Sequence, residues 1–136
     1  MSALGAFTFV LHSHLPYMRL SGRWYHTEEW IHDAIIETYL PLLETLYDLK
    51  EEGVPFRLTL GLSPVLAEQL ADPLVLQHFT PYLKERIAAA EKDMLYFEKD
   101  AYNEHLRFLA EWYADIFKRI KTAFNERFNR DLIGAF

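Results

Sequence analysis

Two short apolar segments of the chain have the pattern of β-strands. Residues 6–11 are apolar and rich in β-formers, and polar or turn residues follow them directly, which predicts a buried strand. In residues 54–62, large apolar side chains take every second position, on the opposite face from Arg57, Thr59 and Gly61. The pattern therefore predicts a second strand over residues 54–62.

A long amphipathic segment connects the two predicted strands. Between residues 28 and 52, apolar residues recur at steps of three and four, as an amphipathic helix requires. Thr27 is placed to cap the start of this helix, and Gly53 to end it. Pro41 lies inside the pattern and has no amide donor, so a kink or break is predicted near residues 39–40.

The second half of the chain has the pattern of helices. Three oxygen-bearing residues stand directly before a proline, which is typical of helix starts: Ser63-Pro64, Asp72-Pro73 and Thr80-Pro81. From Tyr82 to about Phe128 the pattern stays helical, with a join between two helices predicted near residues 100–103.

The order of these elements predicts an α/β fold. A strand followed by a helix and a second buried strand is the βαβ unit of a parallel sheet, and here mostly helix follows it. Two parallel strands are too few for a stable sheet and leave both outer edges open. We therefore expect further strands, or a second copy of the chain, to complete the sheet.

Composition narrows the classes of function. The 136 residues, 51% of them apolar, are enough for one globular domain with a core. A formal charge of -6, from 20 acidic and 14 basic residues, argues against a surface that binds nucleic acid. Cysteine is absent, which excludes disulfides and thiolate metal sites and suits a reducing cytoplasm. The start lacks the pattern of a signal peptide and no apolar run could span a bilayer, so we expect a cytoplasmic protein without a membrane partner.

A pair of histidines follows the first predicted strand. Because side chains alternate along a strand, His12 and His14 share one face. The opposite face carries bulky side chains that we expect to pack on helices: Phe7, Phe9 and Leu11. The carboxyl ends of parallel strands are where α/β barrels and open α/β sheets build their sites. The sequence thus predicts a site around the two imidazoles.

The chemistry of the two histidines remains open from the residues alone. Imidazoles donate hydrogen bonds to sugar hydroxyls, relay protons, bind metals or serve as packing residues. A His-x-His at the end of a first barrel strand also fits metal-dependent hydrolases, with a divalent ion held by His12 and His14. The other histidines belong to predicted helices or their starts and do not complete a metal site: His26, His32, His78 and His105.

Aromatic residues occupy the loop that follows, over residues 18–26. Trp24 and Tyr25 are candidates to stack on the apolar face of a sugar, or else rim residues beside the first helix. Trp30 and Trp112 fall on apolar faces of predicted helices and are expected in the core.

Carboxylates are numerous, but glycoside hydrolysis needs two of them facing one bond. The candidates lie on predicted helices, where they are expected to be solvated: Glu37, Glu44, Glu51, Glu52, Glu85, Glu91, Asp93, Glu98, Glu111 and Asp115. We predict no catalytic residue among them.

Three segments together resemble a known family. Residues 11–17 (LHSHLPY), 37–43 (ETYLPLL) and 59–70 (TLGLSPVLAEQL) are similar to the amino-terminal part of family 57 glycoside hydrolases, above all to their α-1,4-glucan branching enzymes. The resemblance implies an incomplete (β/α)7 barrel. It also implies retaining transfer of an α-1,4-linked glucan chain to a 6-hydroxyl, through a glucosyl-enzyme intermediate.

The resemblance also implies roles for particular residues. The strand-end motif of the family maps onto His14-Leu15-Pro16, with His12 beside it, which implies that these histidines bind the donor sugar. Together with two aromatic residues that follow, they make up the predicted substrate-binding set: His12, His14, Tyr17 and Trp24. The nucleophilic Glu and the acid/base Asp of the family come on later strands, beyond Phe136.

Residues 1–136 are therefore expected to be the amino-terminal portion of a catalytic barrel domain that is inactive alone, without cofactor or metal. The expected partner is an α-glucan such as amylose or glycogen, within glycogen biosynthesis. A non-catalytic glucan-binding or assembly module, self-associating through the open sheet edges, is the alternative outside enzymes.

Overall fold

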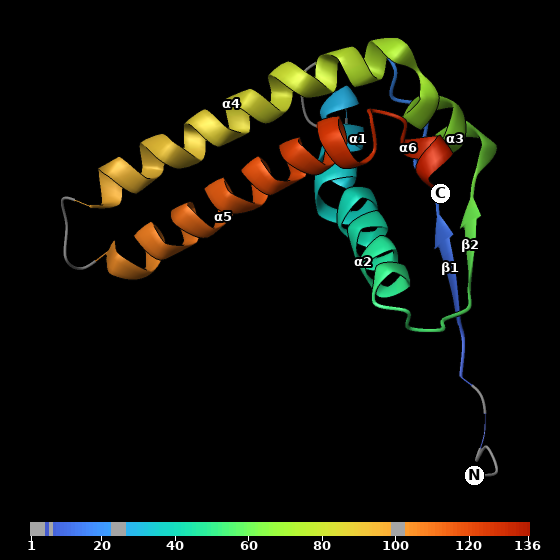
Figure 1. Cartoon of the computed structure of the whole chain (residues 1–136). Helices are drawn as coiled ribbons and strands as arrows, with labels where there is room; N and C mark the ends of the chain where they lie inside the picture. Colours follow the sequence, from blue (N-terminus) through green and yellow to red (C-terminus); the bar gives the residue numbers. More distant parts are fainter. Residues whose placement is uncertain (1–4, 6, 23–26, 99–102) are drawn as a thin grey trace.

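The chain folds as a βαβ unit followed by helices (Figure 1). The computed structural model describes residues 5, 7–22, 27–98 and 103–136. Strand β1 (Phe9–Ser13) pairs in parallel with β2 (Leu58–Leu62), and the helical segment between them crosses from one to the other. The predicted α/β class, with two parallel strands followed by mostly helix, is confirmed.

The sheet is small and its second strand is shorter than predicted. In the ladder Phe9 lies opposite Leu58 and Ser13 opposite Leu62, and no third strand pairs with either edge in the part of the chain that the structure describes. Residues 54–57 lie outside β2. The Val54 amide is still bonded to Leu49 O of the preceding helix (2.9 Å), and Pro55 has no amide to give to a ladder.

The α-helical connection is interrupted close to the proline. Helix α1 (Glu28–Ala34) passes through a π-helical turn, η1 (Ile35–Tyr39), into α2 (Leu40–Glu51). Pro41 is the second residue of α2, and a π-turn absorbs the register change where the α-helical hydrogen bonding is interrupted. The predicted kink or break near residues 39–40 is therefore confirmed as a break, because the α-helical pattern is interrupted up to Tyr39.

The two ends of this helical segment differ in how they are capped. Gly53 ends α2 with a φ of 72°, its amide bonded to Lys50 O and that of Val54 to Leu49 O, as in a Schellman motif. Thr27 stands at the N-cap of α1 but makes no side-chain capping bond, and its buried Oγ1 has no partner among the described residues. The predicted helix start at Thr27 is therefore confirmed, but its side chain does not cap the helix.

Two of the three predicted helix starts are confirmed. Ser63 Oγ accepts from the amide of Leu66 (3.3 Å) at the start of α3 (Pro64–Ala71). Asp72 accepts from the amides of Leu74 (2.8 Å) and Val75 (3.3 Å) at the start of α4 (Pro73–Phe97).

The third predicted start, Thr80-Pro81, is wrong, because it lies inside α4. Buried residues lie on either side of it: Phe79, Tyr82 and Leu83. Their packing stabilises a continuous helix although Pro81 has no amide to donate to the preceding turn.

Helices α4 and α5 (Glu104–Thr122) form a long hairpin that extends away from the sheet (Figure 1). The join between them, residues 99–102, lies outside the described residues. Helix α5 buries the small side chains of Ala110 and Ala114, and Trp112 lies between them on the other side of the helix, about half exposed. Trp30 is also exposed, because this helical segment buries Ile31 and Ile35, which lie four residues apart on another face. The prediction that both tryptophans are core residues is wrong.

The hydrophobic core lies among the helices and not on the sheet. After α5 the chain continues through a π-turn, η3 (Ala123–Arg127), to α6 (Leu132–Ala135). The largest fully buried apolar side chains come from all these helical segments: Ile31, Ile35, Leu40, Leu43, Leu66, Leu70, Phe79, Leu83, Ile120, Phe124 and Leu132. No helix among the described residues is long and apolar enough to cross a membrane.

The first half of β1 lies outside this core. Phe9 is 56% exposed, Phe7 is more exposed still, and Leu11 alone of the bulky face is partly buried. The prediction that this face packs on helices is therefore wrong for Phe7 and Phe9, because the helices bury their apolar faces mainly against one another.

Candidate functional site

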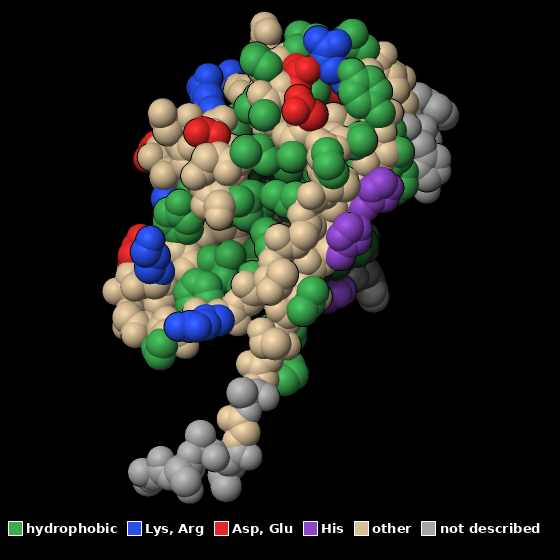
Figure 2. All heavy atoms as spheres, turned by 90° about the vertical axis from the view of Figure 1, so that its right-hand side faces the viewer, with side chains coloured by type: hydrophobic (Ala, Val, Ile, Leu, Met, Phe, Trp, Pro, Cys, Tyr) green, Lys and Arg blue, Asp and Glu red, His purple; other side chains and the backbone are tan. Residues whose placement is uncertain are grey.

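The predicted site lies where the two parallel strands end. Because β1 and β2 run in the same direction, His12 and His14 lie at the same edge as the start of α3. The amide of Ser63 donates to Ser13 O (3.1 Å), which continues the ladder one step beyond β2. His12 and His14 are both exposed, and histidine side chains gather on this face of the molecule (Figure 2).

A glycine stands opposite the first histidine. Gly61 pairs with His12 in the ladder, and a Cβ at Gly61 would lie 3.4 Å from His12 Nδ1. A hydrogen atom at this position leaves the imidazole free to lie over the neighbouring strand. Gly61 thereby sets the space available to His12.

The loop after β1 presents an aromatic ring to solvent. Leu15 and Met18 are buried and anchor the loop on the helices, whereas Tyr17 between them is 63% exposed. The structure thus brings Tyr17 to the surface in the same short segment as His14. Trp24, the fourth predicted substrate-binding residue, lies outside the described residues.

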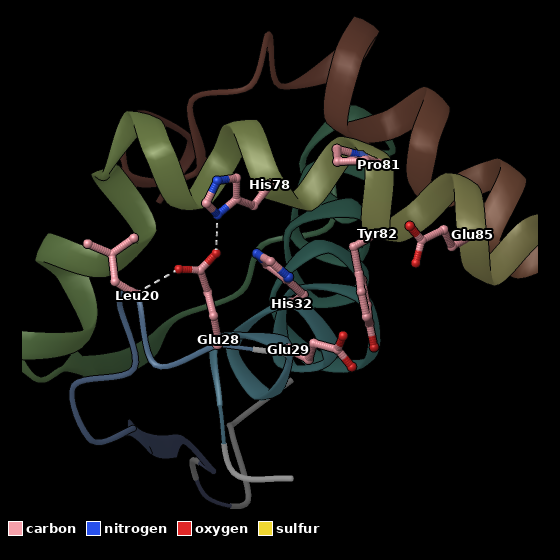
Figure 3. Close-up of a pocket in the computed structure, with 9 residues that line it drawn as sticks. Leu20, Glu28, Glu29, His32, His78, Pro81, Tyr82 and Glu85 are labelled. Carbon is pink, nitrogen blue, oxygen red and sulfur yellow. Dashed lines mark hydrogen bonds and ion pairs between the residues drawn. The ribbon is translucent and has the colours of Figure 1, made fainter. Parts of the chain in front are cut away.

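A second cluster of polar residues lines a cavity beside this loop (Figure 3). The cavity has a volume of about 300 Å³ and lies between the loop end, α1 and α4. Its lining combines carboxylates, two imidazoles and apolar surface: Leu20, Gly22, Glu28, Glu29, His32, His78, Pro81, Tyr82 and Glu85.

Glu28 connects the loop to α4. Its carboxylate is buried; one oxygen accepts from the amide of Leu20 (2.9 Å), and the other pairs with His78 Nδ1. A buried carboxylate needs such partners, because its removal from water is otherwise costly. Glu28 therefore joins the loop just before α1 to α4, which follows fifty residues later in the sequence.

His32 is a buried and neutral member of this cluster. Its Nε2 lies 3.2 Å from Val75 O, and because a carbonyl oxygen only accepts, Nε2 carries the proton. Burial lowers the pKa of His32, while Glu28 and the Val75 carbonyl oppose this effect. Its Nδ1 is buried and has no hydrogen-bond partner among the described residues.

A hydrogen-bonded chain fixes α1 to α4 on the far side of His32. The Tyr82 hydroxyl donates to Asp33 Oδ1 (2.5 Å) and accepts from Arg86, whose guanidinium lies 4.6 Å from the centre of the Tyr82 ring. Burial raises the pKa of Tyr82, and the carboxylate of Asp33 adds to this effect. Tyr82 therefore stays protonated and serves as a structural donor.

The carboxylates predicted to be solvated are exposed, with one exception. Glu44 is partly buried, lies 3.5 Å from Arg119 Nε, and has its pKa raised by burial. The others are confirmed as exposed: Glu37, Glu51, Glu52, Glu85, Glu91, Asp93, Glu98, Glu111 and Asp115.

Within the described ranges, no group of three or more His, Cys, Asp or Glu residues is placed to hold a metal ion. What the strand ends offer instead is two exposed imidazoles and an exposed tyrosine. Such groups can hydrogen-bond and stack on a ligand rich in hydroxyl groups.

The sequence reasoning missed the cluster around Glu28. A signal was present, because Glu28 and His32 lie four residues apart on one helix face, and so do His78 and Tyr82. Nothing in the sequence indicated that these two faces meet, since the segments are separated by more than forty residues.

The chain matches glycosyl hydrolase family 57 over residues 8–136 and belongs to that family. It is 44% identical over 90 residues to a 1,4-alpha-glucan branching enzyme of Thermococcus kodakarensis. It is also 46% identical over 72 residues to a probable 1,4-alpha-glucan branching enzyme of Mycobacterium tuberculosis. These matches cover 66% and 53% of the chain but only 13% and 14% of the two relatives.

Solved structures agree with this assignment. The GH57-type branching enzyme of Pyrococcus horikoshii superposes with a TM-score of 0.87 at 39% identity, over 95% of this chain and 23% of that one. The alpha-amylase AmyC of Thermotoga maritima superposes with a TM-score of 0.79 at 27% identity, over 94% of this chain and 24% of that one. The fold is therefore that of the amino-terminal part of a family 57 barrel, and the chain spans under a quarter of these proteins.

Proposed function

We propose that this chain is the amino-terminal part of a 1,4-α-glucan branching enzyme and that its strand ends bind the glucan. The enzyme would transfer an α-1,4-linked chain to a 6-hydroxyl with retention of configuration. Family membership and the branching enzymes among the relatives support this activity over a metal-dependent hydrolase.

The observation that carries the proposal is the exposure of three residues at and just after the end of β1. His12 and His14 are exposed there, and Tyr17 is exposed in the next few residues. Imidazole donors suit sugar hydroxyls, and an aromatic ring suits the apolar face of a pyranose. Trp24 completes the proposed substrate-binding set from the sequence alone.

The chemistry would need groups that these 136 residues do not supply. A double displacement requires a nucleophilic carboxylate and an acid/base on either side of one glycosidic bond. The exposed carboxylates of α4 and α5 lie on the projecting hairpin, away from the strand ends (Figure 1). We therefore expect this chain to bind glucan without branching it.

Titration of the chain with maltoheptaose, followed by NMR, tests the binding site. Tyr17→Ala should weaken binding about tenfold, a loss of stacking of about 1.4 kcal/mol. Tyr96→Ala is the matched control, because Tyr96 is 70% exposed on α4 and distant from the strand ends. Equal affinity of the Tyr17 and Tyr96 variants would reject Tyr17 as a ligand.

The branching activity itself is tested on the longest natural product of the gene. We would measure its intact mass and then the α-1,6 linkages formed after incubation with amylose. New linkages support a branching enzyme. Release of maltooligosaccharides without new linkages would indicate a hydrolase of the same family instead.

Two further parts of the proposal concern the cell and the assembly. The branching enzymes among the relatives support a role in glycogen biosynthesis, and the absence of cysteine from these 136 residues suits a reducing compartment such as the cytoplasm. The open edges of the sheet support self-association of the isolated chain. Light scattering over a range of concentrations tests this, and a constant monomer mass would reject it.

A further inference from the structure

We propose that Gln69, Asp72 and Glu28 are positioning residues that together hold the loop of residues 14–22 in its substrate-binding conformation. They act through the part of the loop that carries Tyr17, so the inference rests on the proposed function for its biological meaning. The contacts themselves are independent of that function.

Gln69 holds the peptide groups on both sides of Tyr17. Its side chain is 1% exposed, and its Oε1 accepts from the amide of Met18 (2.5 Å). Its Nε2 donates to Pro16 O (3.0 Å) and to Val65 O of its own helix (3.1 Å). A buried amide with both ends satisfied is specific for this loop conformation, since any other would leave a buried polar group unpaired.

Asp72 holds the next residue of the loop. Its Oδ2 lies 2.5 Å from Arg19 Nε, while its Oδ1 caps α4 through the amides of Leu74 and Val75. Partial burial raises the pKa of Asp72, but these amides and Arg19 together bring the pKa below its ordinary value. The carboxylate therefore remains ionised and ties Arg19 to the start of α4.

Glu28 holds the end of the loop in a rarely adopted conformation. Leu20 has a φ of 59°, which is unfavourable for a residue with a side chain, and its amide donates to Glu28 Oε2 (2.9 Å). The turn is closed by the amide of Ser21, which donates to Met18 O (3.1 Å). Strained conformations persist where neighbouring contacts hold them, often at ligand-binding sites.

These contacts reach residues 16, 18, 19 and 20, one before and three after Tyr17. The exposed ring of Tyr17 therefore projects from a backbone that is fixed on both sides. A loop ordered in advance binds its ligand without the entropy cost of ordering it. If the loop is released, affinity falls in proportion to the fraction of molecules that keep the binding conformation.

The substitution Gln69→Glu tests the inference in the complete 136-residue chain. A carboxylate cannot donate to Pro16 O, and it would face the carbonyl oxygens of residues 16 and 65 unpaired. Glu68→Gln is the matched control, because Glu68 is the exposed neighbour on the same helix. Asp72→Asn serves as a second variant that keeps a capping oxygen for α4 and removes the charge that binds Arg19.

Three readouts separate positioning from general stability. Hydrogen exchange at the amides of Met18 and Leu20 reports the loop, exchange in α4 and α5 reports the core, and titration with maltoheptaose reports the site. For Gln69→Glu we expect protection at Met18 and Leu20 to fall about tenfold or more while the core amides stay protected. Affinity for maltoheptaose should fall about tenfold in parallel.

A loss of amide protection in the loop together with a loss of affinity for maltoheptaose supports the positioning role. Asp72→Asn should likewise lower both the protection of the Leu20 amide and the affinity. Unchanged loop protection in both variants, or affinity that is unchanged when protection is lost, overturns the inference. A wild-type chain that binds no maltoheptaose would refute the proposed glucan site, while the exchange data would still decide whether the three residues hold the loop.

Discussion

Gly61 lies directly across the parallel ladder from His12, and a Cβ on Gly61 would lie 3.4 Å from His12 Nδ1. The histidine comes from the first strand and the glycine from the second, about fifty residues later. The space for the imidazole is therefore created by the pairing of the strands.

Substituting Gly61 should move His12 in proportion to the size of the new side chain. Ala adds one methyl at ordinary contact distance and should be tolerated, whereas Gly61→Val forces the imidazole out of its position. We expect large changes in the NMR shifts of the His12 ring for Val and small ones for Ala. Thr59→Val is the control, because Thr59 lies on the same strand as Gly61 but pairs with Val10 and not with His12. Equal shifts in the Thr59 and Gly61 valine variants would contradict the prediction.

The buried His32 should make the free energy of unfolding depend on pH. In the folded state burial lowers the pKa of His32 below its ordinary value of 6.5. As the pH falls below about 6.5, the unfolded chain therefore binds more protons than the folded chain. Stability should therefore be full above this pH and decline below it, until the folded pKa is reached. Urea denaturation at a series of pH values measures the slope.

Substitution of His32 tests the source of this slope. His32→Gln keeps a donor for Val75 O but does not titrate, so the decline below about pH 6.5 should become shallower. His105→Gln, at an exposed position of α5, should leave the slope unchanged. A slope that persists in His32→Gln would assign the pH dependence to another group.

Asp72 should contribute to stability as the cap of α4. Asp72→Ala removes the acceptor for Leu74 and Val75 and should lower the free energy of unfolding by about 1 kcal/mol, as helix N-caps generally do. Because the folded pKa of Asp72 is below its ordinary 3.8, the charged form contributes above that pH and is lost as the pH falls below it. Asp93→Ala, on the exposed face of the same helix, is the control in urea denaturation at pH 7. Equal losses in both variants would contradict the capping role.

Leu20 should tolerate asparagine better than isoleucine. Its φ of 59° is a conformation that Asn adopts readily and that a β-branched residue rarely adopts. Leu20 is exposed, so neither change removes much buried surface. We expect hydrogen exchange at Ser21 and Met18 to accelerate in Leu20→Ile and to stay close to wild type in Leu20→Asn. The reverse order would show that the backbone conformation at this position does not limit the loop.

Local signals predicted much of the secondary structure. Ser63 and Asp72 each stand before a proline and cap a helix, Gly53 ends α2, and Pro41 marks the π-turn before α2. These predictions succeeded because each depends on a residue and its immediate neighbours. Thr80-Pro81 carries the same local signal, but the buried residues around it belong to a continuous helix, and packing prevailed.

The sequence by itself determined the order of elements, the helix caps at Ser63 and Asp72, the family resemblance and the position of His12 and His14 at the end of the first strand. Each of these follows from short-range geometry or from the motif that the residues spell out. The tertiary structure alone decided that Trp30 and Trp112 are exposed, that Glu28 meets His78, and that Gln69 spans the loop around Tyr17. The reason is physical: which faces meet depends on the packing of segments forty or more residues apart, and periodicity within one segment carries no information about its neighbour.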